Sequence, residues 1–223
     1  MDQRKRVFSG IQPTGDAHLG NYLGVFQRWA QMVDEYECYY CIVDLHAITQ
    51  DYTRDQLMQR VFDLTLSLIA SGIDPEKCTL FVQSHVPQHT ELTWLFNIAV
   101  GVGDLQRMTQ FKEKSTGLES VNAGLLNYPV LQAADILLYR ADFVPVGNDQ
   151  RQHLELSRGI ARKWNARFGD FFPEPETLTG AGSRVLGLDG VSKMSKSKDN
   201  TVPMLAGPEE LWSRIRTALV LFT

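Results

Sequence analysis

The sequence predicts an α/β fold, with a Rossmann-like parallel sheet flanked by helices and interrupted by a helical insertion. Three strand-like apolar segments alternate with two helical segments over the first 83 residues, namely 6–11, 18–33, 38–44, 54–70 and 79–83. Parallel strands of this kind are joined by right-handed crossovers, and ligands bind beyond their carboxyl ends. We therefore expect the loops after Ile11 and Asp44 to border one crevice.

Each segment is predicted from its residue pattern. Between residues 18 and 33, apolar side chains recur at helical spacing, and Asp16 is expected to cap that helix. Gly72 ends the next helix. The region from 88 to 139 is mostly helical, and the rest of the chain is expected to form a strand at 143–146 and helices at 149–168 and 209–221.

Composition excludes several classes of protein. The formal net charge of -4 over 223 residues argues against binding nucleic acid with the whole surface, although a local basic site remains compatible with it. No apolar run is long enough to span a bilayer, so no membrane partner is expected. Three cysteines, an odd number, favour a reducing cytoplasm over a disulfide scaffold. Cys38 and Cys41 have metal-pair spacing but lie in a predicted strand, which favours packing in the core.

Two segments far apart in the chain could bind phosphate. Residues 191–198 (Val-Ser-Lys-Met-Ser-Lys-Ser-Lys) combine three ammonium groups with hydroxyls near glycines, which suits a mobile cationic loop. Taken alone, the same run could be a solvated surface turn. Residues 10–21 run from a strand end through a glycine-containing loop into a helix N-terminus, which favours anions. His18 and Asn21 share one face of that first turn, as an ordinary capped helix would also allow.

Together these segments resemble the two signature motifs of the class I aminoacyl-tRNA synthetases. His18-Leu19-Gly20-Asn21 is similar to the HIGH motif, with Asn21 in place of the final histidine, and Lys193–Ser197 is an intact KMSKS motif. The asparagine variant, preceded by residues 8–15, resembles the tryptophanyl branch of that family. The resemblance extends over essentially the whole chain and includes residues 41–49, 108–115, 133–138 and 145–150.

The resemblance implies a tryptophan–tRNA ligase activity. L-Tryptophan would react with Mg²⁺-ATP to give tryptophanyl-adenylate and pyrophosphate, and the acyl group would pass to tRNA(Trp). Mg²⁺ would enter with the ATP substrate, and no metal held tightly by the protein is implied. The family resemblance also implies a homodimer in the cytoplasm, with residues 88–120 at the interface.

It further implies a division of the chain. We expect a first half of the nucleotide-binding catalytic domain at 1–87, a helical insertion and dimer interface at 88–140, and a second half carrying the KMSKS loop at 141–205. Residues 206–223 would begin a truncated C-terminal helical region, because the family continues into an anticodon-binding domain at this point.

The motifs imply a set of site residues. The catalytic side chains would be those of Lys193, Lys196, Lys114, His18 and Asn21. ATP would contact Gln12, Pro13, Thr14, His18, Gly20, Asn21, Gly147, Asn148, Asp149, Val185, Lys193, Met194, Ser195, Lys196 and Ser197. Tryptophan would contact Phe8, Gly10, His46, Tyr128, Asp135, Val144, Val146 and Gln150.

Some roles stay open at this level. Asp135 stands in an apolar run, where an unpaired carboxylate is costly. It could form a salt bridge, for instance to Arg140, or accept the indole N–H as the resemblance implies. Lys114 belongs to a lysine run that could equally be a solvated helix face. Asn148 and Gln132 depart from the family pattern, and no side-chain role is assigned to them.

Three other functions compete with this one. A tyrosyl-tRNA synthetase-like enzyme would share the fold and both motifs, but its pocket would need polar groups for a hydroxyl. A nucleotidylyltransferase could use a similar histidine-glycine loop but would lack the complete lysine-serine motif. A truncated tryptophan- or nucleotide-binding module would bind its ligands without charging tRNA.

Overall fold

The predicted α/β fold is confirmed by a computed structural model, which describes residues 4–49, 51–117, 119–147, 150–178, 185–195 and 198–218. Its five-stranded sheet is parallel throughout and has the order β3-β2-β1-β4-β5. The strands are β1 (Arg6–Ile11), β2 (Glu37–Ile42), β3 (Thr79–Val82), β4 (Phe143–Val144) and β5 (Glu176–Thr177). The chain builds outward from β1 in one direction and then in the other, so a topological switch point lies between β1 and β4.

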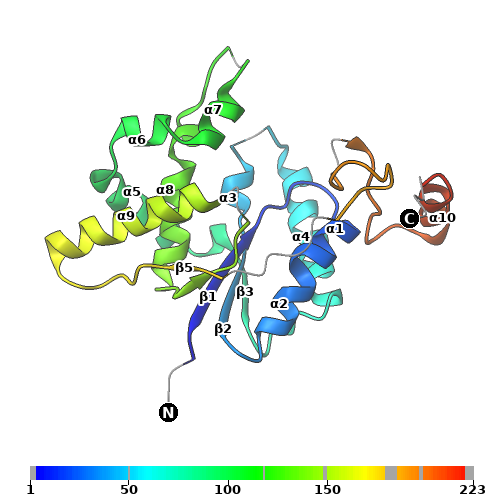
Figure 1. Cartoon of the computed structure of the whole chain (residues 1–223), viewed down its shortest axis with the longest axis horizontal. Coiled ribbons are helices and arrows are strands. Elements are labelled where there is room, and N and C mark those ends of the chain that lie inside the picture. The colour runs from blue at the N-terminus through cyan, green and yellow to red at the C-terminus, as the bar shows by residue number, and fades with distance from the viewer. Residues whose placement is uncertain are drawn as a thin grey trace.

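Helices cover both faces of this sheet (Figure 1). The first helical run consists of α1 (Leu19–Asn21), a π-helical turn η1 (Tyr22–Phe26) and α2 (Gln27–Met32). The other helical segments are α3 (Asp44–Ala47), α4 (Arg54–Ala70), η2 (Gln83–His85), α5 (Gln88–Phe96), η3 (Asn97–Ala99), α6 (Val102–Gln106), α7 (Thr109–Ser115), α8 (Ala123–Leu138), α9 (Arg151–Phe168) and α10 (Pro208–Arg216). Among the described residues, no helix is long and apolar enough to cross a membrane.

The two faces of the sheet belong to two separate cores. Val7 and Tyr40 point to the side covered by α2 and α4, where they pack with Phe26, Trp29 and Leu68. The alternate residues of the same strands point the other way and meet α8 and α9, in a cluster formed by Phe8, Cys41, Val43, Ile136, Ala141, Val144 and Leu154. This period-two alternation is what a sheet buried on both faces requires.

The cysteine prediction is confirmed. Cys38 and Cys41 are both buried and carry free thiols, and they belong to the cores on opposite faces of the sheet. Burial raises the pKa of both thiols, which keeps them protonated. They therefore pack as small apolar side chains.

Most predicted elements are observed, with differences at their ends. The segments 6–11 and 54–70 match β1 and α4. The strand expected to reach Asp44 ends at Ile42, because Asp44 already begins α3. The strand expected at 143–146 is confined to two residues, α9 begins at Arg151 and α10 ends at Arg216.

The prediction that Asp16 caps the first helix is wrong. The helix begins at Leu19, and His18 occupies the N-cap position. Residues before it are extended because they pair with a distant segment: the Leu19 N–H donates to the Val202 carbonyl at 2.9 Å, and His18 forms an antiparallel bridge with Pro203. A tertiary contact therefore sets where the helix starts.

Tyr40 provides a test of the first core. Its ring stacks on Trp29 with 4.3 Å between centroids, and its hydroxyl donates to the Trp29 carbonyl at 2.7 Å. Tyr40→Phe keeps the stacking and removes the buried hydrogen bond, so the free energy of unfolding should fall by about 1 kcal/mol. Urea denaturation measures this change. Tyr52→Phe, at a partly exposed ring beside Arg60, is the control, and an equal loss in both variants would contradict the assignment.

Candidate active site

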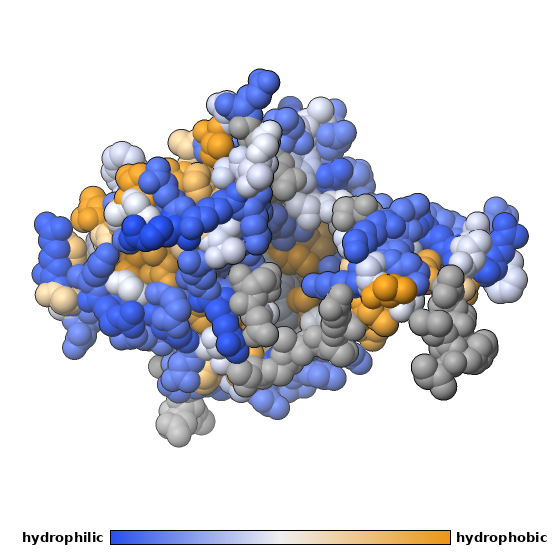
Figure 2. Space-filling view, turned by 45° about the horizontal axis from the view of Figure 1, so that its top comes forward, coloured by the Kyte–Doolittle hydropathy of each residue, from blue (hydrophilic) through white to orange (hydrophobic). Residues whose placement is uncertain are grey.

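A cavity of about 1250 Å³ lies at the carboxyl ends of β1 and β4, where the strand order switches. Its walls come from the end of β1, the start of the first helical run, α7, α8, the loop after β4 and residues 185–195. Figure 2 shows a hollow on this face of the molecule with hydrophobic residues at its floor. This is the position where open α/β sheets bind their ligands.

Most of the predicted site residues line this cavity. They are Phe8, Gly10, Gln12, Thr14, His18, Gly20, Asn21, His46, Lys114, Tyr128, Asp135, Val144, Val146, Gly147, Gln150, Val185, Lys193, Met194 and Ser195. Pro13 is buried and is not among the lining residues, so its predicted contact with ATP has no support here. The predicted residues Asn148, Asp149, Lys196 and Ser197 lie outside the described part of the chain.

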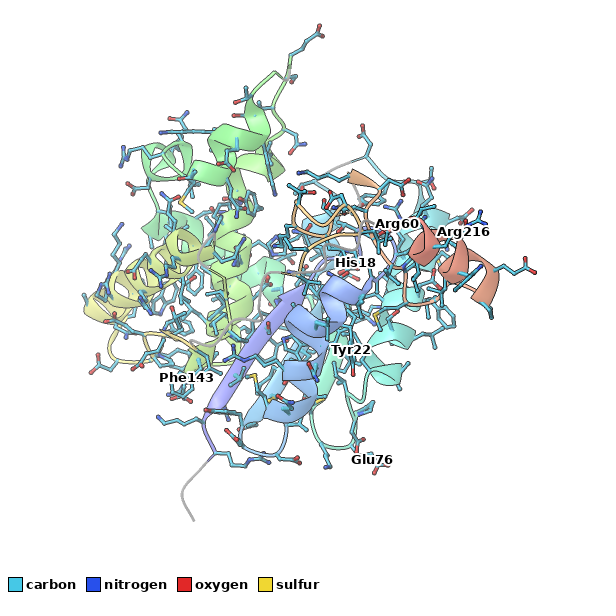
Figure 3. All side chains as sticks on the ribbon, turned by 45° about the vertical axis from the view of Figure 1, so that its right-hand side comes forward. His18, Tyr22, Arg60, Glu76, Phe143 and Arg216 are labelled. Atoms are coloured by element: carbon cyan, nitrogen blue, oxygen red, sulfur yellow. The ribbon has the colours of Figure 1, made fainter. Side chains whose placement is uncertain are left out.

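His18 stands at the entrance to the first helical run. Figure 3 shows it above the carboxyl end of β1, whereas Phe143 pairs with Val7 near the other end of that strand. The backbone N–H of His18 donates to Asn21 Oδ1 at 3.0 Å, which fixes the asparagine side chain against the helix start. The first turn thus presents an imidazole, an amide and the positive end of the helix to the cavity.

The lysine-rich segment forms a hairpin, which we call the lysine hairpin (residues 185–195). Leu186 and Lys193 form an antiparallel bridge, and the N–H of Gly187 donates to the Ser192 carbonyl at 2.8 Å. The prediction of a merely solvated turn is therefore too simple, because the backbone of the hairpin is paired across its two arms. Pairing fixes the direction in which Lys193 leaves the backbone.

The side chain of Asn200 forms hydrogen bonds with both arms of the lysine hairpin. Its side-chain amide donates to Asp189 Oδ2 at 2.9 Å and to the Lys193 carbonyl at 3.3 Å, and its Oδ1 accepts from the Ser195 N–H at 2.8 Å. A Cβ added to Gly187 would lie 2.0 Å from Asn200 Nδ2, so only glycine leaves room for this side chain. The hydrogen bonds of Asn200 therefore depend on glycine at position 187.

The segment after the lysine hairpin is bonded to the His18 region. The Leu19 N–H donates to the Val202 carbonyl at 2.9 Å, and the Met204 N–H donates to the Ala17 carbonyl at 2.8 Å. These bonds flank His18 on both sides. Two segments separated by more than 180 residues are therefore held side by side next to His18, which itself lines the cavity.

A second contact brings the lysine hairpin itself to the same place. The Gly20 N–H lies 3.2 Å from Met194 Sδ, and a Cβ on Gly20 would lie 3.3 Å from Met194 Cβ and 3.0 Å from the His18 ring. Glycine at this position allows the hairpin to lie against the helix start. Lys193 and Ser195, on either side of Met194, line the cavity beside His18.

Lys114 enters the cavity from α7. Its ammonium lies 4.8 Å from the centroid of the Tyr128 ring, in a cation–π contact. Burial lowers the pKa of Lys114 below its usual value of 10.5. The Tyr128 hydroxyl lies 3.0 Å from both Gln110 Oε1 and His153 Nε2, and burial raises its pKa to about 12. Lys114 is exposed overall, as a residue of a solvated helix face would be, but its ammonium contacts the Tyr128 ring and the residue lines the cavity.

Asp135 lies at the floor of the cavity and is only 1% exposed. Its Oδ2 lies 2.8 Å from His46 Nε2, and its Oδ1 lies 2.6 Å from both His89 Nδ1 and Gln83 Nε2. Burial alone would raise the pKa of Asp135, but hydrogen bonds from His46 and His89 outweigh it and hold the pKa below its usual value.

The alternative salt bridge from Asp135 to Arg140 is wrong. The Arg140 guanidinium lies over the Phe171 ring, 5.2 Å from its centroid. His46, predicted to contact tryptophan, lines the cavity but also uses Nε2 to bind Asp135. The contact of His46 that the structure shows is therefore the one with the Asp135 carboxylate.

Apolar side chains surround the Asp135 carboxylate. Phe8, Val144, Val146 and Ile136 line this end of the cavity. A Cβ on Gly10 would lie 2.9 Å from Val43 Cγ1. The absence of a side chain at Gly10 therefore leaves space above the strand, where a flat ring could lie. This end of the cavity is apolar with one ionised acceptor, whereas the other end is polar and cationic.

Several lining residues were missed by the sequence analysis, namely Ser9, Ile11, Gly24, Val25, Arg28, Trp29, Val43, Gln110, Gln132, Ile136 and Pro145. Arg28 follows Asn21 by seven residues, so helical periodicity could have found it. Gln110 and Gln132 carry no such signal. Gln132 Nε2 donates to Gln150 Oε1 at 3.3 Å, a contact between helices that sequence spacing does not reveal.

No cluster of three or more histidine, cysteine, aspartate or glutamate side chains within the described ranges is arranged to hold a metal ion.

The chain is similar to known proteins over nearly its whole length. The family model described as tRNA synthetases class I (W and Y) matches residues 1–220. A tryptophan–tRNA ligase from Deinococcus radiodurans is 52% identical over 218 residues, which cover 96% of this chain and 66% of the relative. The chain thus spans slightly less than two thirds of that relative's length.

Solved structures share the fold. Tryptophanyl-tRNA synthetase from Campylobacter jejuni, complexed with ADP and tryptophan, superposes with a TM-score of 0.91 at 37% identity, covering 98% of this chain and 68% of that one. Tyrosyl-tRNA synthetase from Archaeoglobus fulgidus, complexed with L-tyrosine, gives a TM-score of 0.78 at 25% identity, covering 97% and 66%. The chain belongs to the class I tRNA synthetases of the tryptophan and tyrosine type, and it corresponds to the catalytic portion of a tryptophanyl-tRNA synthetase.

Proposed function

We propose that this chain activates L-tryptophan with ATP, forming tryptophanyl-adenylate and pyrophosphate. The observation that carries the proposal is one cavity with two different ends. One end combines His18, a helix N-terminus and Lys193, which suits a triphosphate. The other end is apolar with Asp135 at its floor, which suits an aromatic ring bearing one N–H.

The reaction needs positioning more than proton transfer. An oxygen of the tryptophan carboxylate attacks the α-phosphorus of ATP, the bond from that phosphorus to the β-phosphate oxygen breaks, and pyrophosphate leaves with the electron pair. Because the nucleophile is already an anion, no side-chain base is required. The protein lowers the barrier by alignment and by stabilising charge on the leaving group. Mg²⁺ enters with ATP and shares that second task.

Each end of the cavity then has a defined role. Lys193, Lys114 and the predicted partner Lys196 neutralise the departing pyrophosphate, and His18 and Asn21 hold the phosphates at the helix start. Asp135 accepts the indole N–H, while Phe8 and the apolar strand ends enclose the ring. Tyr128 and Gln150 face the amino acid backbone. Gly147 and the predicted residue Asp149 would hold the ribose.

Transfer to tRNA and assembly are the wider part of the proposal. The 3′-terminal ribose of tRNA(Trp) accepts the acyl group from the adenylate, and two copies of the chain pair through the helical insertion. Exposed apolar residues on that insertion support a dimer, since Trp94 is 76% exposed and Ile98 and Val102 are each 61% exposed. Sedimentation analysis tests the assembly.

Exchange of labelled pyrophosphate into ATP tests the activation step. The exchange should depend on tryptophan and be much weaker with tyrosine. Exchange driven better by tyrosine would favour the tyrosyl rival, and binding of tryptophan without any exchange would favour a binding module.

Lys193→Ala should reduce the rate of exchange about 100-fold or more, because it removes a cation that acts on the leaving group. The affinity for tryptophan should change little, since that pocket lies at the other end of the cavity. Lys198→Ala, an exposed lysine of the same run, is the matched control and should retain the rate. Equal losses of rate and tryptophan affinity in Lys193→Ala would contradict the assigned role.

Gly187→Ala should displace Asn200, because the new Cβ would lie 2.0 Å from its amide nitrogen. The lysine hairpin would then lose the side chain that joins its arms, and misplacement of Lys193 should cost about 10- to 100-fold in exchange rate. Gly207→Ala is the control, because nothing lies within 4 Å of a Cβ at that position. A Gly187→Ala protein with unchanged exchange would show that the contact of Asn200 with the lysine hairpin is dispensable.

A further inference from the structure

Two fully buried residues beneath the cavity are not explained by packing alone. Gln83 follows β3 in η2, and His89 belongs to α5, yet both side chains reach the same oxygen of Asp135 in α8. Neither residue lines the cavity. Their contact with the site is therefore through the Asp135 carboxylate.

The orientation of Gln83 follows from its second contact. Its Oε1 accepts the backbone N–H of Leu45, at the start of α3, at 3.1 Å. The amide nitrogen must then point to Asp135 Oδ1, where it donates at 2.6 Å. Gln83 thereby connects the ends of β2 and β3 to α8 through one rigid amide.

The tautomer of His89 follows from its contact with Tyr139. Its Nε2 lies 2.9 Å from the Tyr139 hydroxyl. Burial raises the pKa of that hydroxyl, so it keeps its proton and can donate to Nε2. With Nε2 accepting from that hydroxyl, Nδ1 carries the hydrogen and donates to Asp135 at 2.6 Å. Asp135 consequently receives only donors and remains ionised.

The Asp135 carboxylate has three hydrogen-bond donors, from Gln83, His89 and His46, and can accept one more bond. An ionised carboxylate accepts about four hydrogen bonds. Oδ1 accepts from Gln83 and His89, and Oδ2 accepts from His46. The remaining acceptor position is on Oδ2, and Asp135 lines the cavity. A ligand with a single N–H donor fits this position.

We propose that His89 and Gln83 are positioning residues that turn the ionised Asp135 carboxylate toward the cavity and leave Oδ2 open to one N–H donor. They thereby determine the selectivity for an indole over a ring of the same shape without the N–H. The inference rests on the proposed tryptophan pocket and adds the groups that give this pocket its selectivity. A purely structural role would weaken the binding of both rings equally.

The test compares two ligands of nearly the same shape by isothermal titration calorimetry. They are tryptophan and β-(benzothiophen-3-yl)alanine, in which sulfur replaces the indole N–H. The unmodified chain should bind the analogue about 10- to 100-fold more weakly, as expected for a hydrogen bond to a charged acceptor. His89→Leu should lower that ratio about tenfold. His89→Asn should retain most of it, because its amide nitrogen can replace Nδ1.

Two further variants guard against misfolding and general effects. Tyr139→Phe keeps the ring but removes the donor to His89 Nε2, so the imidazole can change tautomer and the ratio should also fall. His85→Leu, at an exposed histidine of the same segment, should leave the ratio unchanged.

The outcomes separate this inference from the proposed function. A ratio equal to that of the unmodified chain in both Tyr139→Phe and folded His89→Leu would overturn the positioning role. A ratio near one in the unmodified chain would overturn the contact between Asp135 and the indole. The expected pattern of ratios without any pyrophosphate exchange would support the inference and count against the activation step.

Discussion

The contact between residues 200–204 and residues 17–20 is the constraint on which the site depends. Backbone hydrogen bonds on both sides of His18 hold the segment that follows the lysine hairpin, and Met194 lies against Gly20. Without this contact the cationic side chains would have no fixed relation to the helix N-terminus. With it, cationic side chains from one end of the chain and hydrogen-bond donors from the other line the same cavity.

A second constraint lies below the cavity, where the Asp135 carboxylate is buried and no lysine or arginine of the described residues pairs with it. Three hydrogen-bond donors from α3, η2 and α5 compensate for the loss of water around Asp135. Such a network costs less than an unpaired charge and leaves the acceptor ionised. The two ends of the cavity thus differ in charge, because lysine ammonium groups line one end and a buried carboxylate lies at the other.

The sequence was sufficient for the elements and for most lining residues, because periodicity and two motifs carry that information. Residues 6–11 and 54–70 are observed with the predicted bounds. The sequence was not sufficient where tertiary contacts determine the end of an element or the partner of a side chain. The helix start at Leu19 depends on pairing with Val202, and the partners of Asp135 come from helices that no local pattern connects. His89 and Gln83 gave no signal in the sequence, because His89 resembles an ordinary polar residue of a helical region and Gln83 resembles the polar last residue of a predicted strand.

The central claim is that one cavity binds both substrates in a defined order along its length. A crystal structure of the chain with a non-hydrolysable tryptophanyl-adenylate analogue, carrying a sulfamoyl group in place of the phosphate, tests it most directly. The account predicts the indole nitrogen within hydrogen-bond distance of Asp135 Oδ2 and the sulfamoyl group beside His18 and Gly20. An analogue bound with its indole away from Asp135, or with its sulfamoyl group remote from the helix start, would contradict the account.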